Sequence, residues 1–278
     1  MTGLEIRPTA VAGSWYPRSA AALTEEVDRG LREARRAPDG EIRALIAPHA
    51  GLMFSGGVAA HAYRAAAPGS YDVVVLIGPS HFVGFDGAAV WDRGAFETPL
   101  GPLAIDEAGA QALEAASPLV VRRTDVHVRE HSLEMQLPFL RHLLPTVPIV
   151  PVLMGYQTPE TIRSLGEAIA QAFANRRPLL VASSDLSHYQ NAATAWRLDS
   201  RVLDCIARFS ADDLLDVLER EPSHACGGGP MVSVMQAAYA FGARDAAILK
   251  YGDSGDISGD KTAVVGYVAA AFGNFNET

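Results

Sequence analysis

Short runs of apolar residues that end at a glycine, a proline or a polar side chain recur along the chain. Residues 73–77 are five consecutive aliphatic residues that lead into Gly78-Pro79-Ser80, and residues 44–47 and 179–182 have the same character. Such a run predicts a strand buried on both faces, as in a parallel sheet. The carboxyl ends of such strands are where open α/β sheets bind ligands.

Between these runs, apolar residues recur every three or four positions, which predicts amphipathic helices. Leu23, Val27 and Leu31 follow a predicted N-cap at Ser19, for example. We find no internal repeat and no linker in the sequence. We therefore expect a single α/β domain over residues 1–278, with a central, mostly parallel or mixed sheet flanked by helices on both faces.

Two helix starts are predicted near polar clusters. Ser55 is a candidate N-cap for a small-residue helix that ends near Ala66. Pro138 lies within an apolar stripe at helical spacing, which predicts a kink or a helix start at that proline. If a helix precedes it, Glu130 and Glu134 share one helical face because they are four residues apart.

Composition excludes several classes of protein. The chain has 278 residues, of which 49% are hydrophobic, and its formal net charge of −9 argues against nucleic acid as a partner. No apolar run approaches the roughly 18 residues that span a bilayer, so we expect no membrane segment. The two cysteines, Cys205 and Cys226, do not form a disulfide framework, so a cytoplasmic location is expected.

Candidate chemistry gathers where the predicted strands end. His49, His81 and the pair Asp185 and His188 each follow an apolar run, and Cys226 begins the glycine-rich segment CGGGP. Imidazole suits iron, copper and zinc, and a thiolate favours soft or borderline metals. Asp185 and His188 would complete the metal shell, orient a ligand or move protons. The alternative is a pair of hydrogen-bonded loop histidines with a buried cysteine.

The helix predicted after Cys226 bears on its thiol, because the positive end of a helix lowers the pKa of a nearby thiol. Glu130, His131 and Glu134 form either a carboxylate–imidazole set at the same pocket or the polar front of a helix. Trp15 and Tyr16 are expected as core or pocket wall, while His127 is expected at the surface.

Eight segments together resemble the MEMO family, in the family's order and over nearly the whole chain. They are AGSWYP, APHAG, IGPSHF, TPLG, EHSLEMQLPFL, SSDLSHY, ACGGGP and YGDSGDISGDKTAVVGY. Bacterial members are described as protein B of the AmmeMemoRadiSam system, which implies an AMMECR1-type protein and a radical SAM protein as partners. The fold of the family is similar to that of class III extradiol dioxygenases, which open catechol rings with non-haem Fe(II).

The resemblance implies that His49, His81 and Cys226 are the metal ligands and that Asp185 and His188 line the same pocket. The dioxygenases hold iron through two histidines and a glutamate, whereas Cys226 stands at the third position here. A thiolate changes the electron density at iron and is itself prone to oxidation. Members of the family are associated with iron and copper binding and, in animals, with signalling and phosphopeptide binding.

Three functions are therefore considered. The first is a metal-dependent oxidoreductase, related to extradiol dioxygenases, that acts on an unknown small molecule. It would use Fe(II) or copper, with His188 as general acid/base oriented by Asp185. The second is a non-catalytic protein that binds a metal or ligand, or a signalling partner. The third is a zinc hydrolase with Glu130 or Glu134 as its base.

Overall fold

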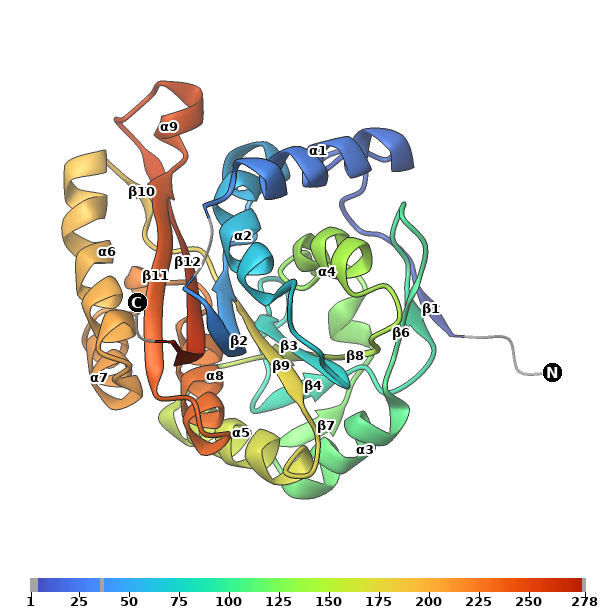
Figure 1. Ribbon diagram of the computed structural model, residues 1–278. Helices are drawn as coiled ribbons and strands as arrows, with labels where there is room; N and C mark the ends of the chain where they lie inside the picture. Colours follow the sequence, from blue (N-terminus) through green and yellow to red (C-terminus); the bar gives the residue numbers. More distant parts are fainter. Residues whose placement is uncertain (1–4, 36–37, 277–278) are drawn as a thin grey trace.

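A large mixed sheet forms the centre of the molecule (Figure 1). The computed structural model describes residues 5–35 and 38–276. Within these residues, nine strands form one sheet in the order β10-β12-β2-β9-β3-β8-β4-β7, with β11 also paired to β12. The strands are β2 (Gly40–Ala47), β3 (Val73–Pro79), β4 (Ala88–Val90), β7 (Val120–Arg122), β8 (Ile149–Met154), β9 (Pro178–Ser183), β10 (His188–Gln190), β11 (Asp245–Asp253) and β12 (Val264–Phe275).

The central part of the sheet is parallel, as predicted. Strands β2, β9, β3 and β8 pair in parallel, while β12 and β4 run antiparallel at either side of them. All residues of β3, β8 and β9 are buried, because helices cover both faces. The carboxyl ends of β2, β9 and β3 therefore meet at one edge of the sheet.

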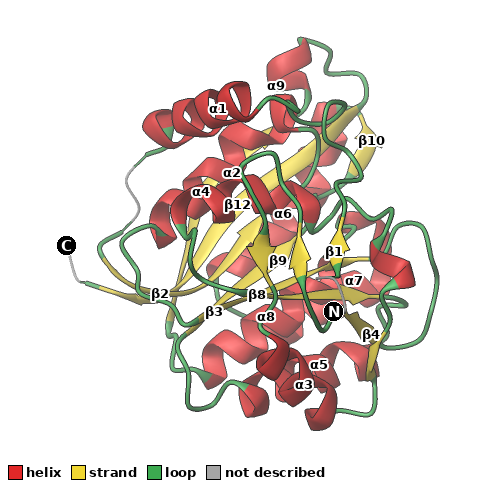
Figure 2. Ribbon diagram, turned by 90° about the vertical axis from the view of Figure 1, so that its right-hand side faces the viewer, coloured by secondary structure: helices red, strands yellow, loops and turns green. Residues whose placement is uncertain are grey.

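Helices pack on both faces of this sheet (Figure 2). Alternate strand residues face opposite sides, so Leu76 packs in one core and Ile77 in the other. The Leu76 side holds α1 (Ala20–Glu33), α2 (Leu52–Ala66) and α4 (Leu137–Leu143). The Ile77 side holds α3 (Glu107–Ala116), α5 (Pro159–Ala172), α6 (Ala192–Ala207), α7 (Ala211–Arg220) and α8 (Gly228–Ala240).

Smaller elements complete the described chain. Three short strands form a separate sheet, and single helical turns occur in the connections. They are β1 (Ile6–Arg7), β5 (Ala95–Phe96), β6 (Leu103–Ala104), η1 (Asp125–His127), η2 (Glu134–Gln136), η3 (Pro222–His224) and α9 (Gly255–Ser258). No helix among the described residues is long and apolar enough to cross a membrane.

Most predicted helix starts are confirmed, with one exception near the strand ends. Ser19 caps α1 through the backbone N–H of Ala22, and α4 begins at Leu137 with Pro138 in its first turn. Ser55 is not a cap: α2 begins at Leu52, and the Ser55 hydroxyl donates to the carbonyl of Ala50. The backbone N–H of Leu52, the first in the helix, donates to the carbonyl of Trp15, which stabilises the earlier start. This contact joins distant parts of the chain, so the local sequence does not predict it.

Candidate metal centre

The two predicted metal-binding histidines lie at neighbouring places on the carboxyl edge of the sheet. His49 follows the last residue of β2 by two positions, and His81 follows that of β3 by two. Strand β9 lies between β2 and β3 and ends at Ser183. The rings of His49 and His81 meet edge to face with their centroids 5.2 Å apart.

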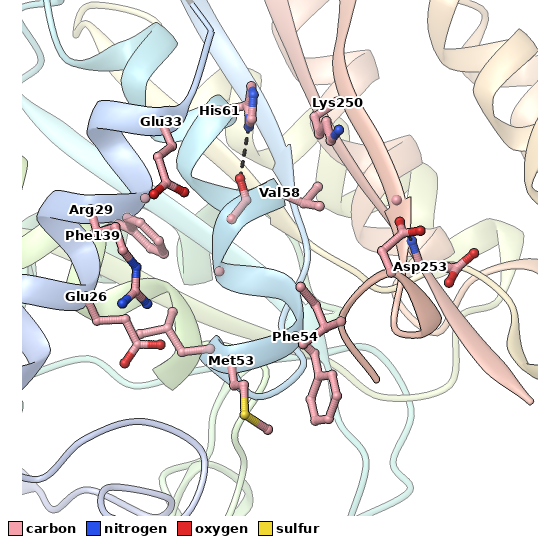
Figure 3. Close-up of a pocket in the computed structure, with 17 residues that line it drawn as sticks. Glu26, Arg29, Glu33, Met53, Phe54, Val58, His61, Phe139, Lys250 and Asp253 are labelled. Atoms are coloured by element: carbon pink, nitrogen blue, oxygen red, sulfur yellow. Dashed lines mark hydrogen bonds between the residues drawn. The ribbon is translucent and has the colours of Figure 1, made fainter. Parts of the chain in front are cut away.

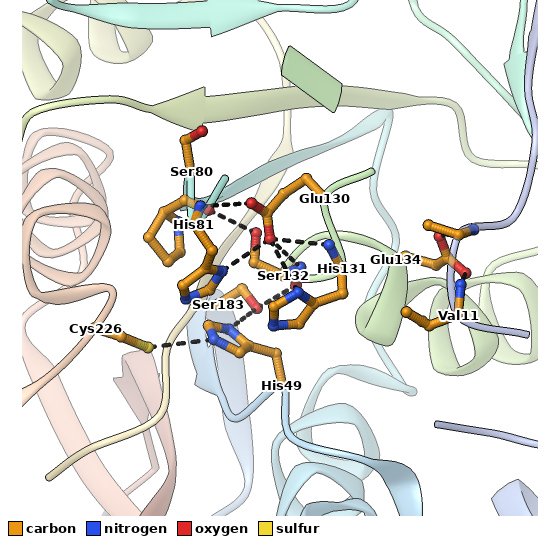
Figure 4. Close-up of polar contacts among 12 residues, drawn as sticks. Val11, His49, Ser80, His81, Glu130, His131, Ser132, Glu134, Ser183 and Cys226 are labelled. Atoms are coloured by element: carbon orange, nitrogen blue, oxygen red, sulfur yellow. Dashed lines mark hydrogen bonds and ion pairs between the residues drawn. The ribbon is translucent and has the colours of Figure 1, made fainter. Parts of the chain in front are cut away.

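Cys226 joins these histidines from the loop before α8 (Figure 4). Its Sγ lies 3.2 Å from Nε2 of His49. The next residue must be glycine, because a Cβ at Gly227 would lie 2.4 Å from the carbonyl oxygen of Ser183. His49, His81 and Cys226 offer ligand atoms that all lie within 4.8 Å of one another. These three residues form a candidate metal site, as the sequence predicted.

Glu130 orients the imidazole of His81. Its Oε1 accepts from Nδ1 of His81 at 2.9 Å, and its Oε2 accepts from the His81 backbone N–H at 2.6 Å. Burial alone would raise the pKa of Glu130, but His81 and backbone donors such as the Ser132 N–H outweigh it and hold the pKa at about 2. A carboxylate that holds Nδ1–H leaves Nε2 of His81 directed toward a metal.

His131 forms a wall of the pocket with two exposed aromatic residues. Its ring stacks on His81 at 4.6 Å between centroids and lies 4.4 Å from the ring of Trp15. The ring of Phe82 meets that of His131 edge to face, with the centroids 5.9 Å apart. Burial is the main cause that lowers the pKa of His131 to about 4, so the ring is neutral near pH 7.

Asp185 holds the His49 loop rather than His188. Its Oδ1 accepts from the His49 backbone N–H at 2.7 Å, and burial raises its pKa to about 7. His188 bonds instead with the backbone of Leu186. Burial, and after it the proximity of His81, lowers the pKa of His188.

The thiol of Cys226 does not show the lowered pKa that a position before a helix suggested. Burial is the largest cause that raises the pKa of Cys226, and Asp185 adds to it. The backbone N–H of Gly227, at the start of α8, acts in the opposite direction without offsetting burial. In this environment the protein alone favours the neutral thiol, and a bound cation would favour the thiolate.

Glu134 points away from this pocket, and the expectation that it shares a helical face with Glu130 is wrong. It is fully buried and accepts from the Arg7 guanidinium, from the Val11 backbone N–H at 2.9 Å and from the Tyr16 hydroxyl at 2.7 Å. Glu130 lies in the non-helical segment between η1, which ends at His127, and η2, which begins at Glu134. Tyr16 was predicted to lie either in the core or in the pocket wall, and the structure places it in the core.

Two buried polar residues that connect to His49 were missed by the sequence analysis. The hydroxyl of Ser183, the last residue of β9, lies 2.9 Å from Nδ1 of His49. Gln136 donates to that hydroxyl at 2.8 Å and is fully buried. Ser183 and Gln136 lie in two of the segments that carry the family resemblance, SSDLSHY and EHSLEMQLPFL, but a lone Ser or Gln in an apolar segment does not by itself indicate a role at a metal site.

Two cavities differ in their relation to the candidate metal site. A cavity of about 640 Å³ lies among α1, α2 and β11, and its lining includes Arg29, His61 and Lys250 but none of the three ligands (Figure 3). A second cavity of about 420 Å³ is lined by Cys226 together with mostly apolar residues such as Leu215. The candidate site is therefore identified by the chemistry of its possible ligands and not by cavity size.

Comparison with known proteins agrees with this organisation. The family model described as "Memo-like protein" matches residues 7–271. A "MEMO1 family protein" of Methanosarcina mazei is 38% identical over 273 residues, covering 96% of this chain and 98% of its own length. Another, of Sulfolobus acidocaldarius, is 34% identical over 284 residues, covering 97% and 100%.

A solved structure shares the fold alone. An uncharacterised protein of Escherichia coli K12 superimposes with a TM-score of 0.58 at 15% sequence identity. The match covers 84% of this chain and all of that protein's chain. It supports the α/β architecture described above.

Proposed function

This chain belongs to the Memo-like protein family, and on that premise we propose that it is a metal-dependent oxidoreductase that acts on a small molecule. His49, His81 and Cys226 would hold iron or copper. The observation that carries the proposal is the convergence of two imidazoles and one thiol, from three separate segments, within 4.8 Å.

The three residues fit a transition metal in both distance and chemistry. A tetrahedral metal bound at about 2.0 Å to nitrogen and about 2.3 Å to sulfur separates these donors by about 3.5 Å. The observed separation of Cys226 Sγ and His49 Nε2 is 3.2 Å. Two imidazoles and a thiolate suit borderline and soft metals, including iron, copper and zinc, and disfavour magnesium or calcium.

Each neighbouring residue has a task in this proposal. When bound, the metal would supply one-electron chemistry and polarise an oxygen ligand. Glu130 keeps Nε2 of His81 directed into the site, and Asp185 fixes the loop that carries His49. His188 would move a proton to or from the substrate as general acid/base. His131 and Trp15 would wall the pocket and limit the entry of water.

The arrangement of carboxylates argues against the zinc hydrolase. A hydrolase of this type needs a free carboxylate to activate water. Glu130 already accepts hydrogen bonds from the ring and the backbone N–H of His81. It also accepts from the backbone N–H groups of His131 and Ser132. Glu134 is turned toward the N-terminal segment and is bound to Arg7. Neither carboxylate is free to serve as the base.

Replacing His188 separates turnover from metal binding. We expect His188→Ala to retain the parent's metal content and to lose 100-fold or more of O₂ uptake, within the usual range for a lost acid/base. The assay uses anaerobically iron-loaded protein, catechol as trial substrate, ascorbate and an oxygen electrode. His142→Ala is the matched control, because His142 pairs with Asp28 away from the ligand set.

Two results would count against this proposal. Loss of metal from His188→Ala would make His188 a ligand rather than an acid/base. Absence of O₂ uptake by the metal-loaded parent, across catechol and other small reductants, would favour a non-catalytic metal- or ligand-binding protein.

A further inference from the structure

A chain of buried hydrogen bonds ends on the ring of His49. The hydroxyl of Tyr63 donates to Oε1 of Gln136 at 2.8 Å. Nε2 of Gln136 donates to the carbonyl of Pro48 at 2.9 Å and to Oγ of Ser183 at 2.8 Å. Oγ of Ser183 also lies 2.6 Å from the carbonyl of Ser132 and 2.9 Å from Nδ1 of His49. Figure 4 shows Ser183 between His49 and Ser132.

Two backbone carbonyl groups, which can only accept, decide which atoms in this series of hydrogen bonds are donors and which are acceptors. The carbonyl of Pro48 can only accept, so the amide nitrogen of Gln136 must face it, and this orients the amide toward Ser183. The carbonyl of Ser132 can also only accept, so it takes the single proton of the Ser183 hydroxyl. Both lone pairs of that oxygen then serve as acceptors, one for Gln136 and one for His49.

We propose that Ser183 is a positioning residue that fixes His49 as the Nδ1–H tautomer and so presents the lone pair of Nε2 to the metal. The proposal deepens the proposed function and rests on His49 being a ligand. Ser183 and Gln136 are fully buried and His49 nearly so, which leaves the hydroxyl as the acceptor for Nδ1–H. A buried N–H without an acceptor is unfavourable, so the tautomer depends on this one oxygen.

The other tautomer would oppose metal binding. Nε2 of His49 faces Sγ of Cys226 at 3.2 Å. With a proton on Nε2, the ring would donate to that sulfur, and neither atom would be free to bind a metal. The same logic holds for His81, where the carboxylate of Glu130 takes Nδ1–H. Two metal-binding imidazoles are thus set by different acceptors, one a carboxylate and one a hydroxyl.

The test is the tautomer of His49 in metal-free protein, read from the ¹⁵N chemical shifts of ¹⁵N-histidine-labelled samples. We expect a protonated Nδ1 and an unprotonated Nε2 in the parent. In Ser183→Ala we expect a protonated Nε2 or a mixture, and 10- to 100-fold weaker binding of Fe(II) in an anaerobic chelator competition. Ser132→Ala is the matched control, since it removes a buried hydroxyl that donates to Pro79 and spares the carbonyl that Ser183 uses.

The outcomes separate this proposal from the proposed function. A protonated Nε2 in the parent overturns the proposal whether or not Ser183→Ala folds. The proposal is also overturned if Ser183→Ala keeps the parent's tautomer of His49 and loses no more affinity for Fe(II) than Ser132→Ala does. A parent with a protonated Nδ1 that binds no metal supports the tautomer assignment and refutes the metal-dependent function.

Discussion

Single residues at the candidate site were predictable where their chemistry follows a strand end. His49 and His81 follow short apolar runs that predict buried strands, and the structure confirms both strands. The local sequence therefore predicted that both histidines lie at the edge of the sheet. Cys226 was found through its glycine-rich neighbours, which allow the close approach at Gly227. Ser183 and Gln136 were missed because their importance depends on partners far along the chain.

Burial also shifts the pKa of a histidine that lies outside the candidate metal site. His127, expected at the surface, is buried and donates from Nε2 to the carbonyl of Ala89 at 3.1 Å. Burial is the main cause that lowers the pKa of His127 from 6.5 to about 3. The neighbouring guanidinium of Arg7 acts in the same direction.

Because His127 is held neutral in the folded protein, it makes the free energy of unfolding decrease as the pH falls. The unfolded chain binds a proton near pH 6.5 and the folded chain does not, so the contribution is fully present above pH 6.5 and is lost as pH falls toward 3. The loss is at most about 1.4 kcal/mol per pH unit for one group. We expect His127→Gln to lose less unfolding free energy than the parent between pH 7.5 and pH 4.5, measured by urea unfolding. Equal losses in the two proteins would show that His127 is not held neutral.

At the scale of elements, helices with clear caps and apolar stripes were predictable, and the segment that carries Glu130 was not. Pro138 correctly marked the start of α4, but nothing local showed that the residues before Glu134 form turns. Their conformation is set by Arg7, which reaches from β1 to the carbonyl of His127, the carbonyl of Glu130 and the carboxylate of Glu134.

The Arg7–Glu134 pair therefore ties β1 to the segment that positions Glu130. Both side chains are fully buried, so removing the cation would leave an uncompensated buried carboxylate. We expect Arg7→Met to lower the free energy of unfolding by about 3–5 kcal/mol in urea. Arg208→Met is the control, because its partner Asp213 and Arg208 itself are exposed, and its cost should stay below about 1 kcal/mol. Similar losses of unfolding free energy in Arg7→Met and Arg208→Met would contradict the importance of the buried Arg7–Glu134 ion pair.

At the scale of the whole molecule, the fold class followed from the sequence, but the order of the strands did not. Apolar runs and amphipathic stretches predict a covered sheet, yet they do not say that β9 lies between β2 and β3. That order puts the end of β9, with Ser183, between the ends that carry the two histidines. The fold thereby places the acceptor of His49 and the loop of Cys226 at the same edge.

The central claim is that His49, His81 and Cys226 hold a redox-active metal, and metal content tests it most directly. The measurement is elemental analysis of untagged protein purified without oxygen, as the parent, Cys226→Ser and Cys205→Ser. Cys205 is the control because it is also buried, in α6, outside the ligand set. We predict about one equivalent of iron or copper in the parent and in Cys205→Ser, and its loss from Cys226→Ser. Equal metal in all three, zinc in place of iron and copper, or no metal in the parent after anaerobic loading would contradict the claim.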